Sequence, residues 1–176
     1  MGWTTISFWT RPATSRCASL LAITLAFAAP MAQAAETSGL PLPRFVSLRS
    51  DEVNLRTGPG VRYPVDWIYL RKDLPVEVVA EYDTWRKIRD WQGTDGWVHQ
   101  SMLSGRRMMV VTGGLRTLFR ADAIDSPPAA QVEAGVVGRL LQCPRGKALC
   151  RVELSGLQGW MRREEFWGVY NGEFLE

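Results

Sequence analysis

Few residue types in this chain could carry covalent or metal chemistry. The 176 residues include three cysteines and one histidine, His99. A structural zinc site takes four ligands, drawn mostly from cysteine and histidine, and Cys143, Cys150 and His99 are too few. A cysteine hydrolase needs a thiolate beside a base, and the G-x-S-x-G motif of a serine nucleophile is absent from the sequence. We therefore expect no enzymatic activity, no metal and no cofactor.

The first 34 residues have the three parts of a secretory signal peptide. Arg11 and Arg16 form a positive region, the apolar run CASLLAITLAFAAP follows, and Ala32 and Ala34 occupy the small-residue positions of a cleavage site. The run is too short for a comfortable membrane span. We expect cleavage after Ala34, a periplasmic or secreted product, and no integral membrane span after cleavage. The alternative is a retained N-terminal anchor.

Cleavage would leave a nearly neutral chain. The formal charge of the full sequence is +3, and loss of Arg11 and Arg16 would leave 19 basic and 18 acidic residues. Nucleic-acid-binding domains usually carry a basic stripe, whereas the two signs are interspersed here. We therefore expect no nucleic-acid partner.

Cys143 and Cys150 are the two cysteines that remain after cleavage. An oxidising compartment favours their pairing as a disulfide. Two unpaired buried thiols are the alternative.

Short β-strands are the elements expected to position these residues. Residues 75–82 and 149–154 alternate between two sets of side chains with period two, as half-buried strands do. Many short strands separated by Gly, Pro and Asp are typical of a small barrel or sandwich. The expected fold class is all-β.

Two halves of the sequence share a spacing. Leu55 and Trp97 are 42 positions apart, and so are Leu118 and Trp160. Each interval ends in Gly-Trp followed by an apolar residue. A repeat of about 60 residues indicates a duplicated domain, because solenoid periods are nearer 20–50 residues. We place the boundary near residues 104–108.

The segments VNLRTGPGVRYPV, LPVEVV and DTWRKIRDWQGTDGWVHQSML resemble the bacterial SH3-like domain over about residues 44–104. The second half resembles a divergent copy, with Leu149 where family members often have tryptophan. The resemblance implies two small SH3-like β-barrels in tandem after a cleavable signal peptide. The expected domains are the signal peptide 1–34, a linker 35–43, a first domain 44–106 and a second, divergent domain 107–176.

A binding role follows from that resemblance. It implies a non-enzymatic module of the cell envelope that recognises a short peptide, with the peptidoglycan stem peptide as one candidate. The expected partner is therefore a cell-wall peptide or an envelope protein. The alternative is a structural adaptor that holds an envelope protein complex.

The loop NLRTGPGVRYPV is expected to be a structural turn built on Asn54, Gly58, Pro59 and Gly60. Both glycines can adopt positive φ at low cost, the proline fixes its own φ, and the asparagine can bond its local backbone. A phosphate loop would need G-x-x-x-x-G-K-[ST] followed by a helix. The sequence has neither.

Aromatic side chains around this loop are candidates for a ligand groove. If Ile68 and Leu70 face the core, Trp67 and Tyr69 are exposed on the other face. These two could instead cover the second domain, and both readings stay open. Trp97 is expected to be mainly core, because its counterpart recurs in the second half. The groove candidates are Tyr63, Trp67, Tyr69, Trp85 and Trp91.

Overall fold

The computed structural model describes Met1 and residues 37–176. The predicted signal peptide and its cleavage site lie outside the described residues. Within the part of the chain that is described, no helix is long and apolar enough to cross a membrane.

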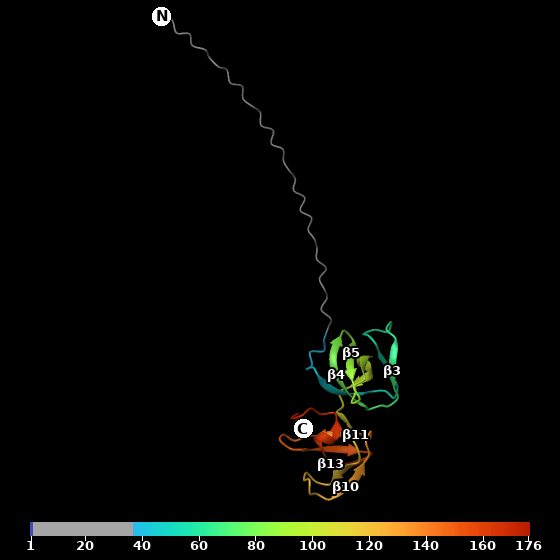
Figure 1. Ribbon diagram of the computed structural model, residues 1–176, viewed down its shortest axis with the longest axis vertical. Helices are drawn as coiled ribbons and strands as arrows, with labels where there is room; N and C mark the ends of the chain where they lie inside the picture. The colour runs from blue at the N-terminus through green and yellow to red at the C-terminus, as the bar shows by residue number, and fades with distance from the viewer. Residues whose placement is uncertain (2–36) are drawn as a thin grey trace. The chain divides into compact units, whose positions relative to one another are not determined.

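The described chain is all-β, as expected, and forms two antiparallel sheets of seven strands each (Figure 1). The first contains β1 (Arg44–Leu48), β2 (Val53–Arg56), β3 (Val65–Tyr69), β4 (Pro75–Tyr82), β5 (Trp85–Arg89), β6 (Asp95–His99) and β7 (Leu103–Ser104), with the 3₁₀ helix η1 (Gln100–Met102) before β7. The second contains β8 (Met108–Val111), β9 (Arg116–Phe119), β10 (Pro128–Val132), β11 (Val137–Gln142), β12 (Leu149–Leu154), β13 (Leu157–Arg162) and β14 (Phe166–Trp167), with η2 (Arg163–Glu165) before β14.

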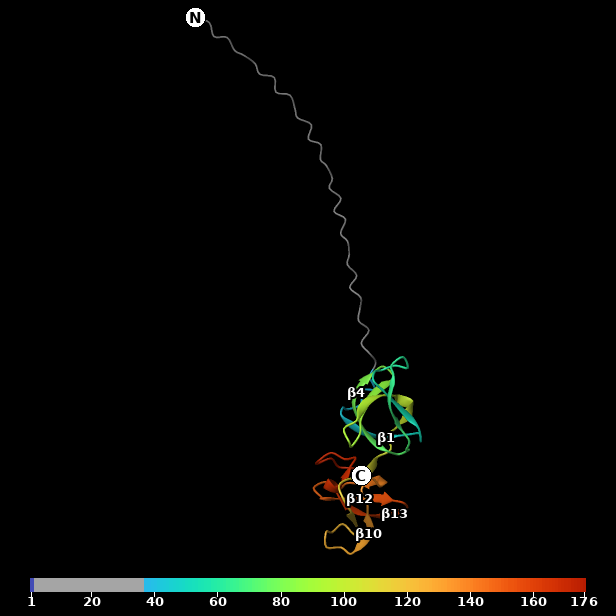
Figure 2. The ribbon, with the colours of Figure 1, turned by 45° about the vertical axis from the view of Figure 1, so that its right-hand side comes forward.

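The two sheets have the same strand order. It runs β3-β2-β6-β5-β4-β1-β7 in the first and β10-β9-β13-β12-β11-β8-β14 in the second, so each strand has a counterpart seven places later. Figure 2 shows the paired strands β1 and β4 of the first sheet. This correspondence defines equivalent positions in the two sheets. That the second half arose by duplication stays a prediction, as do the domain limits and the closure of either sheet into a barrel.

Each sheet has its own apolar core. The first core centres on Leu48, Leu55, Val76, Ile88 and Val98, all completely buried. In β5 the buried positions Arg86 and Ile88 follow the side-chain alternation of extended backbone, whereas the first four residues of β4 are buried on both faces. The core of the second sheet includes Met109, Leu118, Val152, Met161 and both cysteines of the disulfide.

A glycine explains the Gly-Trp repeat. A Cβ on Gly96 would lie 2.6 Å from Cγ of Leu55, and a Cβ on Gly159 would lie 2.6 Å from Cγ of Leu118. In each sheet, a core leucine therefore fills the space that a side chain at the glycine position would occupy. The following tryptophan must face the other side of the strand.

Trp97 is accordingly not a core residue. Gly96 and Val98 are buried, whereas Trp97 is only partly buried on the outer face of β6. Trp160 follows the same pattern between Gly159 and Met161. The expectation that Trp97 is mainly core was wrong, because its repetition reflects the packing of the preceding glycine.

At one equivalent position in each sheet, two residues on neighbouring strands are joined through their side chains. In the first, β4 and β5 pair Glu81 with Arg86, and Glu81 Oε1 lies 3.1 Å from Arg86 Nε. A β-bulge interrupts the β4–β5 pairing and also the β11–β12 pairing. At the same distance beyond the bulge, the second sheet has Cys143 and Cys150, which form a disulfide. The sequence therefore predicted this disulfide correctly.

Both links also hold an end of the described chain. Ser38 donates to Glu81 through its backbone N–H and its hydroxyl, each at 2.7 Å. Leu175 exchanges two backbone hydrogen bonds with Cys143, at 2.8 and 3.0 Å.

Phe45 joins the two sheets. Its ring lies 4.7 Å from that of Trp167 and 4.6 Å from that of Tyr170, centroid to centroid. The Tyr170 hydroxyl donates to Glu77 Oε1 at 2.9 Å, and Arg89 binds Glu77 Oε2 at 2.6 Å. Burial and this hydrogen bond raise the pKa of Tyr170. The contact uses none of the aromatic residues that were considered for it.

Candidate functional site

The loop between β2 and β3 is braced from within. Nη1 of Arg56 donates to the carbonyl oxygens of Tyr63, at 2.8 Å, and Val61, at 3.2 Å. Thr57 N–H donates to Pro64 O at 3.1 Å and closes the base of the loop. These backbone contacts support the interpretation of the segment as a structural turn.

Gly58 and Gly60 serve this turn differently. Gly60 has φ 157°, at the edge of the region that favours glycine. Gly58 does not have positive φ, so that part of the expectation was wrong. A Cβ on Gly58 would instead lie 2.5 Å from the ring of Tyr63. Tyr63 therefore packs onto its own loop, where Arg62 stacks 5.1 Å from its ring centroid.

Tyr69 is a core residue. Only 5% of it is exposed, and its hydroxyl donates to Asp90 Oδ2 at 3.0 Å. Burial first, and then the charge and hydrogen bond of Asp90, raise the pKa of Tyr69. Asp90 Oδ1 accepts from the N–H groups of Gln92 and Thr94, both at 2.9 Å, and so holds the β5–β6 turn. Tyr69 therefore cannot line an exposed groove.

Tyr69 was chosen as a candidate on the assumption that Ile68 and Leu70 face the core, and this assumption was also wrong. Ile68 and Leu70 are 47% and 76% exposed, so they do not face the core. Trp67 pairs with the core residue Leu55 across β2 and β3 but is 53% exposed. This combination arises because β3 is the edge of its sheet. Trp91 packs against the first core.

Trp85 lies in a different set of aromatic side chains. Cross-strand pairing places Tyr82 opposite Trp85, and Trp85 opposite His99, on the outer face of the sheet. The rings of Trp85 and His99 meet edge to face, with centroids 5.6 Å apart. Trp97 is two residues before His99 on the same face of β6. We call Tyr82, Trp85, Trp97 and His99 the aromatic surface.

Cationic side chains border the aromatic surface. Lys87 and Arg56 are the cross-strand neighbours of Trp97, on β5 and β2. Lys87 Nζ lies 3.2 Å from Asp95 Oδ1, with both side chains well exposed. The pKa of Arg62 is raised, first by its hydrogen bond to Tyr63.

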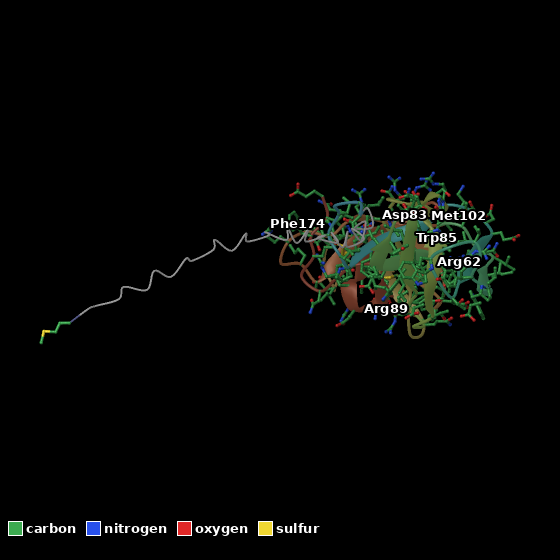
Figure 3. The ribbon with its side chains drawn as sticks, turned by 90° about the horizontal axis from the view of Figure 1, so that it is seen from above. Arg62, Asp83, Trp85, Arg89, Met102 and Phe174 are labelled. Carbon is green, nitrogen blue, oxygen red and sulfur yellow. A yellow bond between two sulfur atoms is a disulfide. The ribbon has the colours of Figure 1, made fainter. Side chains whose placement is uncertain are left out.

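The turn that carries Tyr82 and Trp85 is fixed from beneath by Arg86. This arginine is 5% exposed and donates to the carbonyl oxygens of Asp83, at 2.6 Å, and Trp85, at 3.0 Å. It also donates to Gln100 Oε1 at 2.8 Å, which links the turn to η1. Figure 3 labels Asp83, Trp85 and Arg62 in this part of the molecule.

His99 fixes the beginning of η1. Its Nδ1 accepts from the N–H of Ser101 at 3.3 Å and lies 2.7 Å from the Ser101 hydroxyl. The ring orientation is thus set by the helix it caps, with Nε2 not used in this contact. The aromatic surface is therefore a set of rings in which His99 is held by η1, with Lys87 and Arg56 beside it.

Sequence reasoning found only one member of the aromatic surface among its groove candidates. Tyr82 and His99 were missed, and Trp97 was assigned to the core. The available signal was strand pairing: positions 82, 85, 97 and 99 share a face only once the β4–β5 turn and the β5–β6 register are known.

A family model described as the bacterial SH3 domain matches residues 49–105. The matched residues contain the loop and the aromatic surface. The match ends before the second sheet.

Two solved structures resemble the chain weakly. The structure of NlpC1 from Trichomonas vaginalis has 12% identity and a TM-score of 0.33, covering 74% of this chain and 47% of that one. The structure of NlpC2 from the same organism has 11% identity and a TM-score of 0.33, covering 71% and 48%. The chain thus spans about half the length of either structure. Among curated proteins there is no match.

Proposed function

We propose that this chain, whose residues 49–105 match the bacterial SH3 domain, is a non-enzymatic binding module of the cell envelope. Its ligand is a short peptide held on the aromatic surface, and the peptidoglycan stem peptide is the first candidate. The observation that carries the proposal is the edge-to-face pair of Trp85 and His99, both partly exposed, with Tyr82 53% exposed beside it.

The arrangement suits recognition of a small, flexible ligand. Aromatic rings provide large contact area at low entropic cost, and exposed aromatic clusters commonly mark interaction sites. Because Arg86 fixes the turn under Trp85 and Arg56 braces the neighbouring loop, little ordering would be needed on binding. Lys87 and His99 Nε2 are available for the polar groups of a peptide.

A structural adaptor is the second candidate function. It is favoured by the contact around Phe45, where Trp167, Tyr170 and Glu77 join the two sheets. A fixed pair of sheets would present one continuous surface to a larger protein partner. In that case the aromatic surface would contact protein rather than cell-wall material.

Export belongs to the same proposal. A product cleaved after Ala34 would act in the periplasm or outside the cell, where the disulfide Cys143–Cys150 is stable. Fractionation of cells that produce the protein, followed by intact-mass measurement, tests this step.

Sedimentation with purified sacculi tests the ligand. Trp85→Ala should weaken binding by about 2 kcal/mol, roughly thirtyfold, as expected for loss of a central aromatic contact. Trp67→Ala is the matched control, because Trp67 is an exposed tryptophan on the edge strand and not on the aromatic surface. Circular dichroism must show both variants folded.

Two results would count against cell-wall recognition. One is wild-type protein that does not sediment with sacculi. The other is a folded Trp85→Ala variant that sediments as well as wild type. Either would favour the adaptor, and cross-linking in cells would then identify the protein partner.

A further inference from the structure

The second half of the chain contains a cleft that sequence reasoning did not anticipate. Its volume is about 710 Å³, within the range of small-molecule and peptide sites. One wall is the β11–β12 hairpin at residues 146–148, and the facing wall is the C-terminal segment at residues 169–172. Ile124 and residues 162–164, where β13 passes into η2, complete it.

The cleft begins at Arg162, the position equivalent to His99 of the aromatic surface. In the first sheet, Trp85 on β5 pairs with His99 on β6 just before η1. In the second sheet, Leu149 on β12 pairs with Arg162 on β13 just before η2. Leucine and arginine thus replace the tryptophan–histidine pair, and the hairpin beside them is longer.

The side chains of the cleft are predominantly cationic. Lys147, Arg162 and Arg163 line it, with Glu164 as the one acidic side chain among the lining residues. Lys147 Nζ lies 3.2 Å from Asp122 Oδ2, and Arg162 approaches Glu164 only to 4.0 Å. These are exposed and weak ion pairs, so an anionic ligand can replace them at small cost.

Small apolar groups are interspersed with the cations. Ala148, Val169 and Ile124 contribute to the lining, together with Tyr170. A ligand with a charged group and short apolar groups matches this mixture better than a highly charged polymer does.

The walls are held in place before any ligand arrives. Arg163 donates to the carbonyl oxygens of Lys147, Pro144 and Glu173, and so ties the hairpin to the C-terminal segment. The disulfide between Cys143 and Cys150 closes the hairpin at its base. Such pre-organisation reduces the entropic cost of binding.

We propose that this cleft binds a short peptide through a carboxylate, with Lys147 and Arg162 as the residues that contact it. Charge-assisted hydrogen bonds to a carboxylate are the strongest polar contacts these two side chains can form. The apolar part of the ligand lies along Ala148 and Val169. The site is separate from the aromatic surface, so the proposal does not depend on the function proposed above.

The test is a titration of the ¹⁵N-labelled protein with a defined probe, followed by NMR. The probe is the acetylated tripeptide alanine–glutamate–alanine, and the comparison is its neutral form with glutamine and a C-terminal amide. We expect amide shifts at residues 146–148 and 162–172 with the acidic probe, and at least tenfold weaker binding of the neutral form.

Charge reversal identifies the contacts. Lys147→Glu combined with Arg162→Glu should weaken binding of the acidic probe at least tenfold, and Lys147→Gln alone should weaken it less. Lys72→Glu, which removes an exposed cation from the first half, should bind as wild type. Trp85→Ala should also bind as wild type, which separates this site from the aromatic surface. Reduction of the disulfide should weaken binding, because it releases one wall.

Three outcomes would overturn the proposal. The acidic and neutral probes could bind equally, or the shifts could lie outside the lining residues. The third is that the folded Lys147→Gln variant and the double variant both retain wild-type affinity. Inorganic phosphate at the same ionic strength serves as competitor, and displacement of the probe at equal concentration would point to a general anion site instead of a peptide site.

Discussion

Glu81→Gln is the substitution that most directly tests how the first sheet is held together. The Glu81 carboxylate is 1% exposed and contacts Arg44 Nη2 at 2.6 Å and Arg86 Nε at 3.1 Å. It also accepts both hydrogen bonds from Ser38. Glutamine keeps the shape of the side chain and removes the charge that the two arginines face.

The magnitude follows from the pKa of Glu81. Burial by itself would raise it, but the hydrogen bonds from Ser38 and Arg44 and the charge of Arg86 outweigh burial and lower the pKa from 4.5 to about 2. At 1.36 kcal/mol for each pH unit, this shift corresponds to roughly 3 kcal/mol of folding free energy. Ser38 is exposed, so solvent screens its share of this stabilisation. We therefore expect Glu81→Gln to lower the free energy of unfolding by about 2 kcal/mol.

The sign of the pH dependence is fixed by the lowered pKa. The stabilisation is fully present above the unfolded-state pKa of 4.5 and is lost as the pH falls toward 2. Wild type should therefore exceed Glu81→Gln in unfolding free energy at pH 7, and the difference should shrink between pH 5 and pH 2. Any difference that remains at low pH reports the replacement of a protonated carboxyl group by an amide, because Arg86 then faces a neutral partner in both proteins.

Urea unfolding at pH 7, 5 and 3, followed by tryptophan fluorescence, measures this difference. Urea is preferable to guanidinium chloride, which would screen the ion pair. Glu164→Gln is the matched control, since the Glu164 side chain is 80% exposed and its ion pair with Arg162 spans 4.0 Å. Equal unfolding free energies for wild type and Glu81→Gln at pH 7, or a difference independent of pH, would refute the reasoning.

Four further predictions concern packing, the disulfide and export. Gly58→Ala should cost about 1–3 kcal/mol through the clash with the Tyr63 ring, and Tyr63→Ser in the same chain should recover part of the loss in a double-mutant cycle. Trp97→Ala should remain folded by circular dichroism, with a loss below the roughly 3–5 kcal/mol of a core tryptophan; global unfolding would return Trp97 to the core. Reduction of Cys143–Cys150 should cost about 2–3 kcal/mol, given the sequence separation of 7, and thiol counting before reduction should find none in the exported protein. Intact mass of that protein should correspond to a chain beginning at Ala35.

The alternation of side chains was sufficient to predict most strands. The segments expected at residues 75–82 and 149–154 are β4 and β12 within the same limits. The expected core positions Val76, Val78, Cys150, Val152 and Leu154 are buried, although Glu77 and Leu149 on the opposite faces are buried as well.

The faces of β3 and β6 could not be predicted in the same way. On β3, which is an edge strand, the exposed residues Trp67 and Ile68 lie on both faces, so apolar character no longer identifies the core. On β6 the core position is Gly96, whose missing side chain admits Leu55. A glycine at a core position cannot be recognised in the sequence as an apolar residue. The large neighbouring Trp97 was therefore assigned to the core in its place.

The candidate site depended on register, which a single sequence does not supply. Tyr82, Trp85 and His99 meet through two successive hairpins. The buried Arg86 beneath them was also unexpected, because arginine is rarely buried without a partner. The pairing of Arg86 with Glu81 across the β4–β5 hairpin explains why this arginine is buried.

The equivalent links Glu81–Arg86 and Cys143–Cys150 give the two chain ends different chemical sensitivities. Acid protonates the carboxylate that holds Ser38, whereas a thiol reductant cleaves the disulfide of Cys143, whose backbone holds Leu175. An N-terminal reporter dye should thus gain mobility on acidification and a C-terminal one on reduction. A fusion partner is accordingly best attached at the N-terminus under reducing conditions and at the C-terminus in acid.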